Sequence, residues 1–269
     1  MSQTRSKDGT LIAYDRSGGG PALIIVDGAL CSRGFGPSPK LAPLLARHFT
    51  VYAYDRRGRG ESGDTQPYSH TREVEDLAAL IDAAGGSASL LGLSSGAALA
   101  LHAAAAGLPV ANVVAYEPPY VDADGRRGGS VHERELAHLL EQGKRGSAVS
   151  YFMKDMVCAP AALVYMMRLM PWVFCKLEAV AHTLPYDAAV MTGFRIPRER
   201  FASIALPVLV MNGSKTDARL KSAAQAIAAA IPRAQRRELP GQTHNVKPGV
   251  LTPEVVEFLT RRDGGSTRS

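Results

Sequence analysis

The sequence predicts an α/β protein in which helices cover both faces of a mainly parallel sheet. Two observations support this class: strand-length and helix-length segments alternate along the chain, and several strand segments are apolar throughout, as is typical of strands buried on both faces. The predicted strands span residues 10–16, 22–26, 50–54, 87–91, 111–116, 207–211 and 235–239. The predicted helices span residues 41–48, 71–84, 97–106, 218–230 and 253–262.

The alternation stops between residues 119 and 201, which are helical in propensity and rich in methionine and aromatic side chains. We interpret this segment as a helical cap inserted into a core formed by residues 1–118 and 202–269. Its methionines form either the cap's own apolar core or an adaptable roof over a pocket. The predicted pocket residues are Leu30, Met153, Met156, Met167, Trp172 and Met191.

Composition excludes several functional classes. The chain has 269 residues and a net charge of +6, but its basic residues are interspersed with acidic ones, so we expect no nucleic-acid partner. Cys31, Cys158 and Cys175 have neither a disulfide nor a metal-site spacing, and we interpret them as reduced packing residues. The N-terminal segment Met1 to Asp8 is polar and lacks the apolar core of a signal peptide, and no apolar run has the length of a membrane span. A cytoplasmic protein without a membrane partner is therefore expected.

The segment Gly92-Leu93-Ser94-Ser95-Gly96 has the pattern of a nucleophile elbow, a sharp turn that exposes a serine between a strand and a helix. A predicted strand precedes it and an alanine-rich helix follows it. Small residues two positions before and after Ser94 are needed because the turn brings backbones close together. Ser94 is therefore the candidate nucleophile.

A serine nucleophile needs a base that accepts its proton. His244 is the candidate, because it lies in the loop between the last predicted strand and the last helix. Asp217, in the loop after the preceding strand, is the candidate acid that orients the imidazole. Asp217 is also well placed as the N-cap of a helix, and Glu117, at the end of the strand 111–116, is the reserve candidate.

Four motifs in this order make the chain resemble the α/β-hydrolase superfamily, in particular its serine-nucleophile, capped, carboxylesterase-like members. They are Asp55-x-Arg57-Gly58-x-Gly60-x-Ser62, Gly92-x-Ser94-x-Gly96, Gly213 to Asp217, and Gly241-x-x-His244. The resemblance implies an eight-stranded sheet with a cap, no cofactor or metal, and ester hydrolysis of a small-molecule substrate.

The oxyanion hole, the pair of backbone amides that would bind the developing negative charge, is expected at Ala29 and Ser95. Many relatives have His-Gly before the first of these residues, whereas this chain has Asp27-Gly28. An acidic side chain at that position is unfavourable unless it is paired or turned away, and Arg56 and Arg57 are the candidate partners.

These features predict a carboxylesterase that acts through an acyl-enzyme on Ser94. The same nucleophile, base and acid are also consistent with a lactonase, a thioesterase, a carbon-carbon bond hydrolase or a cofactor-free perhydrolase. A ligand-binding receptor with vestigial hydrolysis is the alternative from another class.

Overall fold

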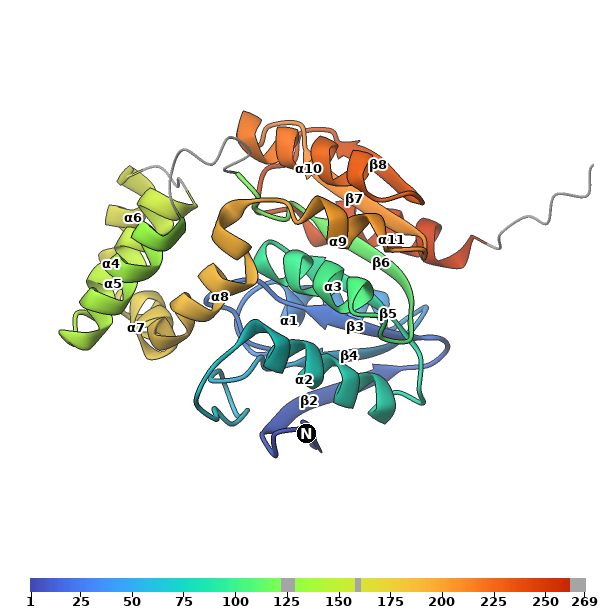
Figure 1. Cartoon of the computed structure of the whole chain (residues 1–269), viewed down its shortest axis with the longest axis horizontal. Helices are drawn as coiled ribbons and strands as arrows, with labels where there is room; N and C mark the ends of the chain where they lie inside the picture. Colours follow the sequence, from blue (N-terminus) through green and yellow to red (C-terminus); the bar gives the residue numbers. More distant parts are fainter. Residues whose placement is uncertain (122–128, 158–160, 262–269) are drawn as a thin grey trace, which may run out of the picture.

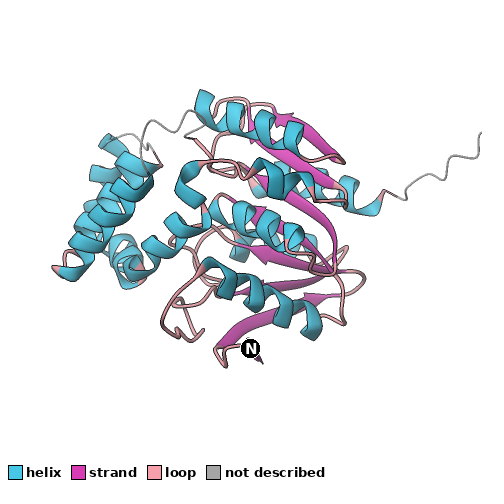
Figure 2. Cartoon of the chain, in the orientation of Figure 1, coloured by secondary structure: helices cyan, strands magenta, loops and turns pink. Residues whose placement is uncertain are grey.

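The computed structural model describes residues 1–121, 129–157 and 161–261. Eight strands form one sheet in the order β1-β2-β4-β3-β5-β6-β7-β8 (Figure 2). The pairs β1·β2 and β2·β4 are antiparallel, and the other five pairs are parallel. The strands are β1 (Ser2–Arg5), β2 (Leu11–Gly18), β3 (Ala22–Val26), β4 (Thr50–Tyr54), β5 (Ala88–Leu93), β6 (Val110–Tyr116), β7 (Val208–Gly213) and β8 (Ala234–Leu239). The mainly parallel eight-stranded sheet predicted from the sequence is confirmed.

Helices cover both faces of this sheet because successive side chains of each strand point to opposite sides. On one face, Ile24 and Val26 join an apolar cluster with α2 (His70–Ala83), α3 (Ser95–Ala105) and α10 (Ala218–Ala230). On the other face, Leu23 and Ile25 pack in a cluster with α1 (Ser38–Leu45) and α11 (Pro248–Thr260). The order of strands reverses at β3, which lies between β4 and β5. Ligands of open α/β sheets bind at the carboxyl ends of strands beside such a reversal.

Between β6 and β7 the described chain is helical. Its elements are α4 (Gly129–Glu141), α5 (Arg145–Tyr151), the π-helix η1 (Phe152–Met156), α6 (Ala161–Arg168), α7 (Pro171–Ala179), the 3-10 helices η2 (Ala181–Thr183) and η3 (Thr192–Phe194), α8 (Leu184–Val190) and α9 (Arg198–Ala202). Figure 1 shows α4 to α7 gathered beyond one end of the sheet, with α8 between them and the core helices. These cap helices share an apolar cluster, which Leu30 joins from the loop after β3.

Within residues 1–121, 129–157 and 161–261, no helix combines the length and the apolar character that a membrane span requires. Cys31 and Cys175 are free thiols. Cys175 is exposed, so its interpretation as a packing residue is wrong, and Cys158 lies outside the described residues.

Candidate active site

Ser94 occupies a strained turn between β5 and α3. Its backbone angles are φ 53° and ψ −125°, a region that L-residues rarely adopt. The flanking glycines are required by close contacts: a Cβ on Gly96 would overlap the carbonyl oxygens of Val26 and Asp27, and one on Gly92 would overlap Ala97. The turn therefore packs directly against the end of β3.

The carboxyl ends of β5 and β6 bring Ser94 and Glu117 onto neighbouring strand ends. Leu93 pairs with Tyr116 in parallel register, and the Ser94 amide donates to the Tyr116 carbonyl over 2.9 Å. Glu117 follows Tyr116 directly, also with a positive φ of 49°, and its amide donates to Met211 of β7. The change of backbone direction at Glu117 ends the strand at the same edge of the sheet as the elbow.

The imidazole of His244 is bound to Glu117. Its Nδ1 lies 2.7 Å from Oε2 of a carboxylate that is completely buried. The other carboxylate oxygen, Oε1, accepts from the Gly213 amide at 2.8 Å and from the Thr216 hydroxyl. Because an ionised carboxylate only accepts, Nδ1 is assigned as the protonated nitrogen, which leaves Nε2 as the basic one. The hydroxyl of Tyr116 donates to the Thr243 carbonyl over 2.6 Å and fixes the loop before His244.

The structure contradicts the assignment of Asp217 as the partner of His244 Nδ1. Asp217 is the N-cap of α10, where its carboxylate accepts from the Arg219 amide at 2.9 Å and forms an ion pair with the Arg219 guanidinium. Its side chain is about half exposed, whereas Glu117 is buried and held from three sides. The reserve candidate Glu117 therefore takes the position expected of the acid.

The loop after β3 lies against the elbow. A Cβ on Gly28 would come within 3.0 Å of the Ser94 Cβ. The amide of Ala29 follows in this loop, and the amide of Ser95 begins α3, where the first N–H groups have no acceptor within the helix. Ser95 thus follows Ser94 directly, and Ala29 follows Gly28, which lies against Ser94. That their amides bind an oxyanion stays a prediction.

A buried network of charges lies beneath this loop. Asp187 of α8 accepts from Arg56 Nη1 at 2.7 Å and from Arg59 Nη2 at 2.6 Å, and Arg56 also binds Glu73 in a bidentate pair. Burial raises the pKa of Asp187, but the charges of Arg59 and Arg56 outweigh it and hold the pKa below its ordinary value. Asp187 is therefore stabilised as a carboxylate by the two arginines although its side chain is buried.

Asp27 has neither of the partners expected for it. Arg56 Nη1 donates to the Asp27 backbone carbonyl at 3.4 Å, and Arg57 binds Asp76 and Asp8. Within the described residues, both carboxylate oxygens lack a hydrogen bond of acceptable geometry, as does the neighbouring Ser38 hydroxyl. Burial raises the pKa of Asp27 to about 7, although Ser38 and the nearby arginines oppose the rise. The expected pairing with Arg56 or Arg57 is therefore wrong.

A narrow cleft beside His244 is lined by both core and cap residues, namely Pro119, Val121, Met156, Val157, Asp217, Arg219, Leu220 and His244. Of the six predicted pocket residues, only Met156 lines it. Leu30 and Met191 are buried in the apolar cluster of the cap, and Met153 and Met167 pack against that cluster. Trp172 is 67% exposed, so its prediction as a pocket residue is wrong.

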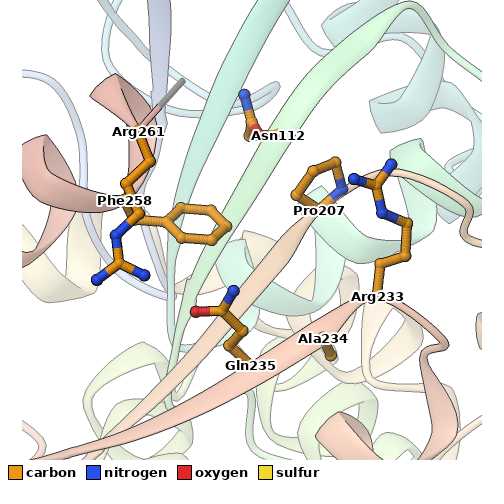
Figure 3. A pocket seen from close by; sticks show the side chains of 7 residues that line it. All are labelled: Asn112, Pro207, Arg233, Ala234, Gln235, Phe258 and Arg261. Carbon is orange, nitrogen blue, oxygen red and sulfur yellow. The ribbon is translucent and has the colours of Figure 1, made fainter. Parts of the chain in front are cut away.

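A second hollow, of about 310 Å³, lies at the opposite end of the sheet (Figure 3). Pro207 and Ala234 in its wall stand at the amino ends of β7 and β8, whereas Ser94 and Glu117 follow the carboxyl ends of their strands. The hollow is larger than the cleft at His244 but is remote from the elbow. Among the described residues, no group of three or more His, Cys, Asp or Glu side chains is placed to hold a metal ion.

Comparisons with known proteins agree with this architecture. A sequence profile of the alpha/beta hydrolase family matches residues 18–257. The structure of an alpha/beta hydrolase from Sphaerobacter thermophilus is 51% identical, with a TM-score of 0.90 over 96% of this chain and 100% of that one. A thermophilic esterase from Thermogutta terrifontis is 20% identical, with a TM-score of 0.72 over 96% of this chain and 97% of the esterase. The enol-lactonase from Burkholderia xenovorans is 22% identical, with a TM-score of 0.69 over 97% of this chain and all of the lactonase.

Proposed function

The chain belongs to the alpha/beta hydrolase family, and we propose that it cleaves carboxylic esters through an acyl-enzyme on Ser94. The observation that carries the proposal is the 2.7 Å contact between His244 Nδ1 and buried Glu117, at the strand end next to the strained Ser94. A serine on an elbow becomes nucleophilic only beside a base, and an imidazole is an effective base when a carboxylate fixes its tautomer.

In the first half-reaction, Nε2 of His244 takes the proton of the Ser94 hydroxyl while Oγ forms a bond to the ester carbonyl carbon. The carbonyl π electrons move to oxygen, and the amides of Ala29 and Ser95 bind the resulting oxyanion. When the oxyanion collapses, the bond from carbon to the alcohol oxygen breaks, and His244 returns its proton to that oxygen. Glu117 stabilises the imidazolium that exists between these two transfers.

In the second half-reaction, water takes the place of Ser94. His244 accepts a proton from water as the water oxygen attacks the acyl carbon, and the same oxyanion forms again. Collapse breaks the bond to Ser94 Oγ, which recovers a proton from His244. The products are the carboxylic acid and the free enzyme.

The cleft beside His244 favours a small to medium apolar acyl or alcohol group, because Pro119, Val121, Met156, Val157 and Leu220 supply much of its wall. Structural neighbours named as an esterase and as an enol-lactonase share the fold. A lactonase is therefore the second candidate. A lactone is a cyclic ester, and Ser94, His244 and Glu117 would cleave it by the same steps. Thioester, carbon-carbon and perhydrolase chemistry would use the same relay, and a receptor would bind its ligand with at most one turnover.

The proposal is tested with a fluorophosphonate probe and with p-nitrophenyl acetate. We expect the probe to label Ser94 and the wild-type protein to turn over many equivalents of ester. Ser94→Ala should lose both, with a fall in kcat of about 10⁴-fold or more. Ser203→Ala, which changes an exposed serine at the end of α9, is the matched control and should keep full activity. Labelling with a single turnover would favour the receptor, and ester hydrolysis that survives Ser94→Ala would contradict the proposal.

A further inference from the structure

We propose that Asp187, a cap residue, is a positioning residue that holds both halves of the oxyanion hole through Arg59 and the Ser95 side chain. The proposal rests on the proposed function, because it assigns the Ala29 and Ser95 amides to oxyanion binding. It adds a role for the cap in the chemical step, besides its contribution to the wall of the cleft.

Arg59 binds the peptide between Gly28 and Ala29. Arg59 Nη1 donates to the Gly28 carbonyl oxygen over 2.7 Å. That carbonyl and the Ala29 N–H belong to one planar trans peptide, so they point in opposite directions. A guanidinium that holds the oxygen therefore sets the direction of the N–H. Its positive charge also polarises the peptide and strengthens the N–H as a donor.

Arg59 also restrains the rest of this loop. Its Nη1 lies 3.5 Å from the Cys31 carbonyl, so one nitrogen contacts acceptors on both sides of Ala29 and Leu30. Leu30 has a positive φ of 62°, which costs free energy and persists only where the surroundings impose it. The arginine supplies that restraint from beneath the loop.

Asp187 fixes Arg59 and reaches the second half of the hole. Its Oδ2 accepts from Arg59 Nη2 at 2.6 Å, and its Oδ1 accepts from the Ser95 hydroxyl at 2.7 Å. Ser95 is the first residue of α3, and its backbone amide is the second predicted donor. One carboxylate of α8 is thus hydrogen-bonded to the residue that contributes one amide and to the arginine that orients the other.

Burial makes these contacts hard to replace. The side chains of Asp187 and Arg59 are 0% and 1% exposed, so water does not substitute for a lost partner. Removing the charge of Asp187 leaves Arg59 buried without this ion pair, and removing Arg59 leaves Asp187 with Arg56 but without the cation at its second oxygen. Either change favours a rearrangement of the loop. Arg59 Nε also donates to Thr183 of η2, so the arginine binds the cap at two points.

The test compares Asp187→Asn and Arg59→Met with wild-type protein. Misdirected donors bind the transition state less well and the ground state almost equally, so we expect kcat for p-nitrophenyl acetate to fall about 10- to 100-fold with little change in KM. Affinity for a small alkyl boronic acid, which forms a tetrahedral anion on Ser94, should fall by a similar factor.

Asp76→Asn and Arg57→Met are the matched controls. Arg57 and Asp76 form a second buried bidentate pair, at 2.7 and 2.8 Å. Within the part of the chain that the structure describes, this pair makes no hydrogen bond or ion pair with the loop after β3. These variants should lose comparable thermal stability but keep kcat and boronate affinity. Equal kinetic losses in both sets of variants would show a general structural effect and overturn the proposal.

A measurement that needs no turnover separates this proposal from the proposed function. The chain contains two Gly-Ala pairs, Gly28-Ala29 and Gly96-Ala97, so labelling with ¹³C-carbonyl glycine and ¹⁵N-alanine gives two amide signals that report on them. In Arg59→Met and Asp187→Asn we expect the Gly28 carbonyl and Ala29 amide signals to shift, and in the control variants to stay. Shifts without ester turnover by wild type would reject the proposed function but retain the positioning. Unmoved Gly28-Ala29 signals would reject the positioning even if the enzyme is an esterase.

Discussion

His244 Nδ1 lies 2.7 Å from Oε2 of Glu117, a carboxylate at the end of β6, although a second carboxylate follows β7. Glu117 is suited to this position because Gly213 and Thr216 hold its other oxygen, so its orientation does not depend on the imidazole. Asp217 instead caps the N-terminus of α10, where its carboxylate accepts from the Arg219 amide. The two carboxylates therefore differ in role although both leave the same edge of the sheet.

Glu117→Gln should lower kcat by about 10³- to 10⁴-fold, because an amide no longer fixes the tautomer of His244 or stabilises its charged form. Asp217→Asn should leave kcat unchanged and lower the free energy of unfolding by about 1 kcal/mol or less, since asparagine is also a good N-cap. Both are measured by ester turnover and urea denaturation. A large loss of kcat in Asp217→Asn with full activity in Glu117→Gln would restore Asp217 as the acid.

The sequence predicted those parts of the fold and of the site that depend on short motifs and on the order of strands and helices along the chain. The elbow could be found because Gly92, Ser94 and Gly96 are required within one turn, and His244 because it follows the last strand. Glu117 and Asp217 both follow strands of one sheet edge, so only the three-dimensional contact distinguishes them. The local pattern that favours an aspartate before α10 does not reveal whether that aspartate also reaches the imidazole.

The orientation of helices in the cap was also beyond the sequence. Trp172 and Met156 both lie in apolar helical segments, but the packing of the cap turns one to solvent and the other toward the cleft. Likewise, Asp187 is an ordinary helical residue in sequence, and its contacts with Arg56 and Arg59 join positions about 130 residues apart. Such long-range pairs leave no periodic signal.

Asp27→Asn should stabilise the protein at neutral and alkaline pH. The folded-state pKa of about 7 lies above the ordinary 3.8, so the folded state binds more protons and the wild type loses stability as pH rises between these values. The penalty is about 4 kcal/mol above pH 7 and is absent below pH 4. Urea denaturation at several pH values should show an advantage of the variant that grows over this window. Asp82→Asn, at an exposed site of α2, is the control, and an equal advantage at all pH values would contradict the assignment.

His102 should make the protein sensitive to acid. This buried residue of α3 contacts the Val190 carbonyl at 2.9 Å and the Tyr120 hydroxyl at 3.2 Å, so it connects the core to both ends of the cap segment. Burial lowers its pKa from 6.5 to about 4, opposed by the Val190 contact and assisted by His70 and Arg200. Because the unfolded state binds the proton more readily, stability falls as pH drops from 6.5 to 4, by about 3 kcal/mol.

His102→Gln tests this account, since an amide keeps a donor for Val190 and does not titrate in that range. We expect its free energy of unfolding to change less than that of wild type between pH 6.5 and 4. His48→Gln, which alters an exposed histidine next to Phe49, should follow the wild-type curve. A wild-type slope retained in His102→Gln would assign the acid sensitivity to other groups.

Met156→Ala should alter the preference for acyl chain length, and Trp172→Ala should not. Met156 is 4% exposed and lines the cleft beside His244, so its truncation leaves space next to the base. We expect the ratio of kcat/KM for p-nitrophenyl hexanoate to that for the acetate to rise about tenfold, the effect of a few methylene groups in an apolar site. Because a buried methionine is lost, the free energy of unfolding should also fall by about 2 to 5 kcal/mol, so both esters are measured well below the Tm. Trp172, at 67% exposure, should leave the ratio unchanged. If truncation of Trp172 shifted the ratio and that of Met156 did not, the acyl group would bind on the outer side of the cap rather than in the cleft at His244.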